Sequence, residues 1–350
     1  MGELWHKLSY AFLEDLDDLV GIISRAEKLE SCLAIGSNDV RIIGVWGMGG
    51  IGKTTLARVV FDMLSKEFEG CCFLNDVRKS SEEDGLVSLQ QKLILQLLKE
   101  SMSTQDVDEG VFMIKNGLRH KRILLVLDDV DQLDQLKWLA GKHDWFGSGS
   151  RVIITTRNKN LLFEVDDTYD ADGLNDDEAF HLLSLKAFKK DHYPPKDYLK
   201  LSRDLVHYAN GLPLAIEILG SFLFGRGIDQ WRSTLDRLKE FPERKILGVL
   251  EISFDGLDKN EKEIFLNIAC FFNHEIKKEV VEILNYLGLD PHVGLQVLIE
   301  KSLIKMNKKK YWMHDLLQEM GRSIEKPRKK LWLFEDIDDV LTENTVSNYI

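Results

Sequence analysis

The run with the clearest chemical meaning is Gly47-Met48-Gly49-Gly50-Ile51-Gly52-Lys53-Thr54, which fits the pattern G-x-x-x-x-G-K-[ST]. It lies between a strand-like apolar run and a segment with helical spacing, which is the context that the pattern needs. Backbone N–H groups of such a loop surround phosphates, its lysine reaches the β- and γ-phosphates, and its hydroxyl binds Mg²⁺. A chance glycine-rich turn is the alternative. The residues expected to line a nucleotide here are Gly47, Gly49, Gly50, Ile51, Gly52, Lys53, Thr54 and Thr55.

Two neighbouring carboxylates form a second candidate site. The apolar run Ile123 to Leu127 ends in Asp128 and Asp129. A carboxylate at a strand end suits Mg²⁺ held through its water shell, so we expect Asp128 and Thr54 to be the metal-binding pair. Asp129 could position or deprotonate an attacking water, which makes Asp128 and Asp129 the candidate catalytic residues. A pair of aspartates in an ordinary turn is the alternative.

Arg157 is the third candidate element of a nucleotide site. The apolar run that begins at Arg151 ends at Arg157, and strand ends are where ligands bind in doubly wound sheets. Because a guanidinium grips phosphate oxygens bidentately, we expect Arg157 to sense a γ-phosphate. By itself, such an arginine is more often solvated or salt-bridged.

The elements that must position these residues follow from hydrophobic periodicity. Short apolar runs alternate with helical patterns in the first half of the chain, which predicts a parallel sheet covered on both faces. The expected strands are 42–46, 71–74, 123–127 and 151–155. Helical patterns take over after about Asp170. Two short strand-like runs, 303–306 and 310–313, are then followed by a helix from Asp315 to Ile324, which suggests a winged helix.

The predicted fold class is therefore an α/β P-loop nucleotide-binding domain followed by a helical bundle and a winged-helix domain. With 350 residues the chain is long enough for about two or three domains. The predicted segments are an N-terminal linker (1–19), the nucleotide-binding domain (20–170), the helical domain (171–241), the winged-helix domain (242–330) and a C-terminal linker (331–350).

Composition excludes several classes of protein. Apolar residues make up 44% of the chain, which rules out a disordered composition. The net charge of −12 opposes a general attraction to nucleic acid or anionic membranes. Apolar runs are too short to span a bilayer, and acidic residues near the N-terminus break any signal peptide. We therefore expect a soluble protein inside the cell. The cysteines lack metal-site spacing, so reduced structural thiols are expected, including Cys71 and Cys72 in a buried strand.

Taken together, these stretches resemble the NB-ARC module of plant nucleotide-binding leucine-rich-repeat disease resistance proteins, a STAND or AAA+-like P-loop NTPase. The resemblance covers nearly the whole chain. Its further motifs are Phe68 to Arg78, Gly211-Leu212-Pro213-Leu214, Phe265 to Phe272 and Met313-His314-Asp315. Asp131 after Leu127-Asp128-Asp129-Val130 and the sequence FLNIACFF are similar to the branch with a Toll/interleukin-receptor (TIR) domain, and residues 331–345 resemble the stretch before the repeats.

The resemblance assigns further roles. Val20, Gly21 and Ile22 would pack near adenine, Pro213 would stack on the base, and His314 would bond the β-phosphate of ADP, while Asp315 would hold the geometry around it. Exchange of ADP for ATP, with Mg²⁺, would loosen the winged-helix domain and permit self-association.

The resemblance also implies a slow P-loop ATPase used as a switch in plant innate immune signalling. The expected location is the cytoplasm, and an additional nuclear location stays open. Association with full-length receptors through the nucleotide-binding module is also implied. No stretch of this sequence resembles the TIR domain or the repeats, so we expect no NAD-hydrolysing site in it.

Three other functions stay open at this point. A fast-turnover ATPase is compatible with Asp128 and Asp129, although His314 and the helical domain favour retention of ADP. A winged-helix DNA binder with Lys308 to Lys310 at its wing tip is opposed by the net charge. A truncated receptor that acts as a non-catalytic partner or scaffold is the third.

Overall fold

The computed structural model describes residues 19–99, 106–188, 194–240 and 244–325. These residues form two compact units. The first contains the described residues up to Gly47 and the segment Ile51–Leu182, and the second contains Met48–Gly50 and the described residues from Leu183 onward. The expected linker 331–350 and all but the last residue of the expected linker 1–19 lie outside the described residues, and the three-part division of the chain stays a prediction.

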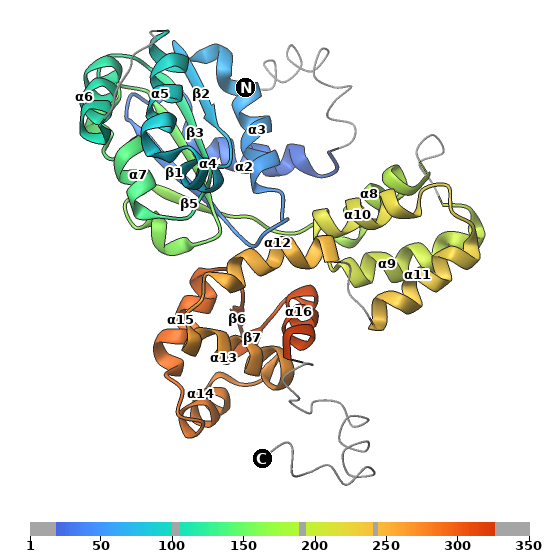
Figure 1. The fold of residues 1–350 in the computed structure, drawn as a ribbon. Helices are drawn as coiled ribbons and strands as arrows, with labels where there is room; N and C mark the ends of the chain where they lie inside the picture. The colour runs from blue at the N-terminus through green and yellow to red at the C-terminus, as the bar shows by residue number, and fades with distance from the viewer. Residues whose placement is uncertain (1–18, 100–105, 189–193, 241–243, 326–350) are drawn as a thin grey trace. The chain divides into compact units, whose positions relative to one another are not determined.

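The first unit is built on a parallel sheet with the strand order β2-β3-β4-β1-β5 (Figure 1). The strands are β1 (Arg41–Trp46), β2 (Gly70–Leu74), β3 (Ile123–Val130), β4 (Arg151–Thr156) and β5 (Asp167–Asp170). The four predicted strands are confirmed. The fifth was not predicted because its sequence, Asp-Thr-Tyr-Asp, lies at the edge of the sheet and lacks an apolar run.

Helices cover both faces of this sheet, as the apolar strands require. They are α2 (Ile22–Leu33), α3 (Lys53–Leu64), α4 (Val77–Glu83), α5 (Gly85–Leu98), α6 (Val107–Leu118) and α7 (Leu133–Ala140). Leu124 and Val126 of β3 share a core with α2 and α3, while Leu125 and Leu127 share the opposite core with α5, α6 and α7. Successive side chains of a strand point to opposite faces, and this alternation produces the two cores.

The second unit is mainly helical. Helix α8 (Asp176–Phe188) crosses the division between the units, and the remaining helices are α9 (Leu199–Ala209), α10 (Pro213–Leu223), α11 (Ile228–Glu240), α12 (Arg244–Asp255), α13 (Lys259–Asn267), α14 (Lys277–Tyr286), α15 (Pro291–Glu300) and α16 (Asp315–Glu325). A π-helical turn, Ile268–Phe272, extends α13. Three aromatic rings, those of Phe188, Tyr198 and Trp231, pack against one another with centroids 5.2 to 5.6 Å apart.

The winged-helix expectation is confirmed. Strands β6 (Lys305–Asn307) and β7 (Lys310–Trp312) form an antiparallel pair that precedes α16. Ile276 adds an isolated antiparallel bridge to Lys310, so the segment before α14 lies against the wing.

The cysteines are free thiols, as expected. Burial raises the pKa of Cys72 to about 12, which keeps this thiol protonated. Among the helices in the described ranges, none combines the length and apolar character needed to cross a bilayer.

Candidate nucleotide site

The glycine-rich loop connects β1 to α3. Gly50 and Gly52 have φ angles of 78° and 96°, in the left-handed region that favours glycine. Gly52 is the N-terminal cap of α3, so Lys53 and Thr54 are the first two residues of the helix. A Cβ atom added to Gly52 would meet nothing within 4 Å, so glycine is required there for its backbone conformation and not for lack of space.

Lys53 is buried within the loop and is 7% exposed. Its Nζ atom donates to the carbonyl oxygen of Gly47 at 2.8 Å. Burial, reinforced by the positive charge of Arg157, lowers the pKa of Lys53 to about 7, although Asp129 and Asp128 oppose the shift. A phosphate would supply the negative charge that favours the protonated form of this lysine.

Thr54 and Asp128 meet directly. The Thr54 hydroxyl donates to Asp128 Oδ1 at 2.8 Å, and the Thr155 hydroxyl donates to the same oxygen at 2.7 Å. Mg²⁺ usually binds one or two protein oxygen ligands together with waters and substrate phosphates. This hydroxyl and this nearly buried carboxylate (4% exposed) therefore fit a magnesium site and would hold the ion against the phosphates of a nucleotide.

The two aspartates form a β-bulge in β3. Leu127 pairs with Ile154 and Val130 pairs with Thr156, so Asp128 and Asp129 together lie opposite Thr155. Asp129 has a φ of 53°, which is uncommon for a residue other than glycine, and its N–H donates to Thr155 Oγ1 at 2.9 Å. The Thr155 hydroxyl thus fixes both residues of the bulge.

Asp129 lies between two arginines. Its Oδ1 atom is 3.2 Å from Nε of Arg157, and its Oδ2 atom is 3.1 Å from Nε of Arg78, in the first turn of α4. Burial would raise the pKa of Asp129, but Arg157 and Arg78, with a smaller effect of Lys53, hold it below its ordinary value. A carboxylate with a lowered pKa is a weak proton acceptor. Of the two roles expected for Asp129, this environment favours positioning a water over deprotonating it.

The expected adenine-side segment precedes α2. Val20 is half-buried, Gly21 has a φ of 70°, and Ile22 is buried. The Arg25 guanidinium donates to the carbonyl oxygen of Gly21 at 2.8 Å and to both carboxylate oxygens of Glu178 at 2.8 and 2.9 Å. The Arg25–Glu178 ion pair fixes this turn. The contact of Val20, Gly21 and Ile22 with adenine stays a prediction.

Pro213 and His314 belong to the second unit. Pro213 begins α10, and the next N–H, that of Leu214, donates to the carbonyl oxygen of Gly50 at 3.3 Å within the same unit. His314 is 5% exposed; its Nδ1 accepts the N–H of Leu316, and its Nε2 lies 3.0 Å from the carbonyl oxygen of Asn210. Burial lowers the pKa of His314, which favours the neutral ring. Because Nδ1 accepts a hydrogen bond, the ring proton lies on Nε2, which donates to Asn210. Its bond to a β-phosphate stays a prediction.

The residues of the first unit that were predicted for magnesium, catalysis and the γ-phosphate gather at the carboxyl ends of β1, β3 and β4. Lys53, Thr54, Asp128, Asp129 and Arg157 are linked there by hydrogen bonds or by mutual charge effects. Sequence reasoning missed the roles of Arg78 and Thr155. Arg78 ends a run that was noted as a motif, and Thr155 lies two residues before Arg157, so their positions were visible although their partners were not.

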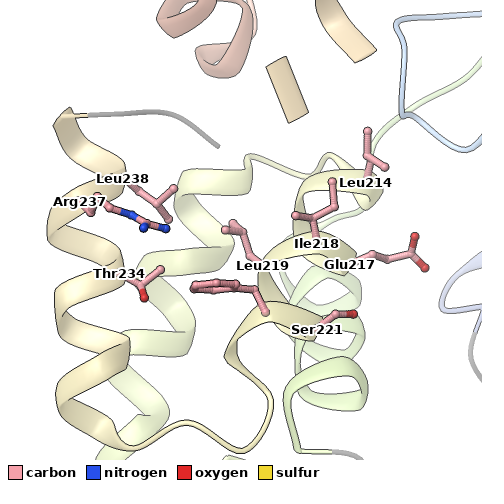
Figure 2. Close-up of a pocket in the computed structure, with 9 residues that line it drawn as sticks. Leu214, Glu217, Ile218, Leu219, Ser221, Thr234, Arg237 and Leu238 are labelled. Atoms are coloured by element: carbon pink, nitrogen blue, oxygen red, sulfur yellow. The ribbon is translucent and has the colours of Figure 1, made fainter. Parts of the chain in front are cut away.

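A separate hollow of about 430 Å³ lies between α10 and α11 (Figure 2). Leu214, Ile218, Leu219, Phe222 and Leu238 give it a mainly apolar lining, with Glu217 and Arg237 as charged lining residues. A triphosphate would meet one guanidinium and one carboxylate there. The glycine-rich loop that precedes α3 is the better match for a nucleotide.

The fold and the site define a P-loop NTPase with a parallel sheet, a helical region and a winged-helix domain. Solved structures share this fold at low sequence identity. A Walker-type ATPase of Pyrococcus abyssi superposes with a TM-score of 0.58 at 14% identity, covering 85% of this chain and 95% of that one. The ORC2 protein of Aeropyrum pernix superposes with a TM-score of 0.50 at 14% identity, covering 88% of this chain and 93% of that one.

Sequence comparison gives the family. The NB-ARC domain model matches residues 24–193, and the winged-helix domain model of Roq1-like disease resistance proteins matches residues 258–328. The TMV resistance protein N of Nicotiana glutinosa is 41% identical over 99% of this chain and 31% of its own length. The disease resistance protein RUN1 of Vitis rotundifolia is 41% identical over 97% of this chain and 26% of its own length. The chain belongs to the NB-ARC family of plant TIR-type disease resistance proteins, and it spans about a quarter to a third of the length of these relatives.

Proposed function

We propose that this chain is the nucleotide switch of a plant disease resistance receptor. It binds ADP at rest and ATP when active, with Mg²⁺, and slow hydrolysis returns it to the resting state. Its role is in innate immune signalling, and it acts in the cytoplasm or the nucleus.

One observation supports the proposal most directly: Arg157 pairs with Asp129, and its charge acts on Lys53 of the glycine-rich loop. The Asp129 carboxylate holds Arg157 at an Nε–Oδ1 distance of 3.2 Å. A guanidinium near the phosphate loop has a second possible partner, the oxygens of a third phosphate. The state of Arg157 would therefore differ between ADP and ATP, which is what a switch needs.

The environment of Asp129 supports a switch more than a fast-turnover ATPase. Rapid hydrolysis is helped by a base whose pKa lies near the working pH. The two arginines hold the pKa of Asp129 below its ordinary value. Slow hydrolysis is therefore the expected behaviour, and a measured turnover above about 1 per second, typical of dedicated enzymes, would favour the motor alternative.

The first experiment identifies the nucleotide that copurifies with the protein. The chain is purified without added nucleotide and denatured, and released ADP and ATP are quantified by chromatography. Near-stoichiometric ADP is expected. Lys53→Ala should lose it, whereas Lys92→Ala, which removes an exposed lysine of the same unit paired with Asp84, should retain it. A folded protein without nucleotide would contradict the proposal and favour a scaffold role.

Self-association is the second part of the proposal. The ATP-bound chain is expected to associate with itself or with full-length receptors through the nucleotide-binding module. Light scattering in ADP and in a non-hydrolysable ATP analogue tests this expectation. An identical monomeric mass in both would contradict it.

A further inference from the structure

Arg78 is the group at this site whose role the switch does not yet explain. It lies in the first turn of α4, and its side chain is 21% exposed. Its Nε atom donates to Asp129 Oδ2, while Arg157 binds the other oxygen of the same carboxylate. One carboxylate therefore serves two guanidiniums, so the three groups together carry one excess positive charge.

The main chain at Arg78 is held by contacts that do not involve Asp129. The Ser81 hydroxyl donates to the carbonyl oxygen of Arg78 at 2.8 Å and accepts from Gln135 Nε2 at 2.8 Å. The Gln135 side chain also accepts the N–H of Asp131 at 2.9 Å. Helix α4 is thus tied to the segment that follows β3, and the backbone at Arg78 would keep its place if Arg157 moved.

Arg157 can leave the Asp129 carboxylate with little loss of stability only if Arg78 stays paired with it. Arg157 follows β4, on the side of the site where its charge acts on Lys53. If Arg157 leaves Asp129 for a third phosphate, the carboxylate, whose side chain is 18% exposed, must be neutralised by another cation. Breaking an ion pair in such a setting is costly when the remaining charge has no partner. Arg78 supplies that partner.

We propose that Arg78 is a positioning residue that sets the preference of the site for a nucleoside triphosphate over a diphosphate, because it keeps Asp129 paired when Arg157 turns to the third phosphate. This inference rests on the proposed function. It predicts that the charge of Arg78 favours binding of the triphosphate and leaves binding of the diphosphate nearly unchanged.

The test measures the affinities of nucleotide-free protein for ADP and for a non-hydrolysable ATP analogue by calorimetry, with Mg²⁺. In Arg78→Gln the ratio of ATP-analogue affinity to ADP affinity should fall about tenfold, within the usual range of coupling between linked sites. Arg78→Lys should restore part of the ratio, because it retains the charge without the planar fork. The matched control is Arg41→Gln, which removes an arginine paired with Asp39 at the opposite end of β1 and should leave the ratio unchanged.

A double-mutant cycle tests the route through Asp129. In Asp129→Asn the ratio should rise, because Arg157 no longer has to leave a carboxylate, and adding Arg78→Gln should then change nothing further. If Arg78→Gln does not fold, the affinity ratio measured for Asp129→Asn still tests the inference.

Each outcome is informative. An unchanged ratio in Arg78→Gln, or no rise in Asp129→Asn, overturns the inference. A fall of equal size with and without Asp129 would mean that Arg78 acts on the phosphate itself, which overturns it as well. If the unsubstituted protein binds neither nucleotide, the proposed function is wrong and the inference falls with it. If it binds both and Arg78 has no effect, the inference alone fails.

Discussion

The Nε2 atom of His314 lies 3.0 Å from the carbonyl oxygen of Asn210, the residue directly before Gly211-Leu212-Pro213. Asn210 ends α9 with a φ of 45°, and its side-chain amide donates to Asp315 at 3.0 Å. Backbone and side chain of one residue thus hold the start of α16. The link joins two motifs that are more than a hundred residues apart in the chain.

Replacement of His314 should weaken this link. His314→Ala removes a buried donor and its ring, so we expect the free energy of unfolding to fall by about 2–3 kcal/mol. Urea unfolding of the whole chain measures this. His207→Ala, an exposed histidine of α9, is the control and should change stability by less than about 0.5 kcal/mol. Equal stability of the two variants would show that the link contributes nothing. If the proposed function holds, His314→Ala should also release ADP faster.

Glu319 makes stability depend on pH in the opposite sense to most carboxylates. Burial, with the nearby Asp315, raises its pKa to about 7, although the Tyr208 hydroxyl donates to it at 3.0 Å. The unfolded chain loses this proton near pH 4.5, so the folded state binds more protons between about pH 4.5 and 7. The stabilising contribution is complete below pH 4.5 and is lost as the pH rises through 7.

Glu319→Gln should therefore be more stable than the unsubstituted protein at pH 8, by roughly 1–3 kcal/mol, and the difference should vanish at low pH. Glutamine can still accept the bond from Tyr208. Thermal melts across this pH range measure the difference, with the exposed Glu282→Gln as control. A difference that does not change with pH would refute the assignment.

Binding of ADP should take up a proton at Lys53. Burial lowers the pKa of this lysine to about 7, and contact with a phosphate would favour its charged form. At pH 8 we expect uptake of close to one proton, and affinity should decline as the pH rises above about 7. Calorimetry in buffers with different ionisation enthalpies counts the protons. Binding without proton uptake at pH 8 would contradict the prediction.

Thr155 should support magnesium binding, because its hydroxyl orients Asp128. Thr155→Val deletes the hydroxyl that bonds Asp128 and the Asp129 N–H, so the affinity for Mg²⁺ in the presence of nucleotide should fall about tenfold, as for other groups that orient metal ligands. Thr156→Val is a matched control, since its hydroxyl bonds the carbonyl oxygen of Val130 and not an aspartate. Both variants should lose about 1–2 kcal/mol of stability, and only Thr155→Val should change the magnesium titration. Equal magnesium affinity in the two would argue against the assignment.

Periodicity predicted the strands that carry the site because each is an uninterrupted apolar run. Helix α3 begins at Lys53, directly after the glycine loop, where a segment with helical spacing was expected. Helix α4 was not predicted, because its sequence from Val77 to Glu83 is mainly polar, with Val77 as its buried residue. The β-bulge at Asp128 and Asp129 was beyond sequence reasoning as well. It depends on which residue of β4 each aspartate faces, and pairing register is a tertiary property.

The interplay of Arg78, Asp129 and Arg157 was unpredictable for a related reason. Each residue was visible in its own motif, but the partner of Arg78 lies 51 positions along the chain. The packing of α4 against β3 brings the two together. Chemistry within one motif can be inferred from spacing, whereas chemistry between motifs requires the fold.

The extra residue in β3 also bears on how the chain tolerates changes in length. Deleting one of the two aspartates would restore regular pairing with β4 and leave the sheet intact, since Leu127 and Val130 would then flank a single residue opposite Thr155. In such a shortened protein a single aspartate would have to bond both the Thr54 hydroxyl of α3 and the Arg78 guanidinium of α4. We predict that the deletion would leave a folded domain. If Arg78 acts as proposed, this domain would no longer discriminate between a nucleoside diphosphate and a triphosphate.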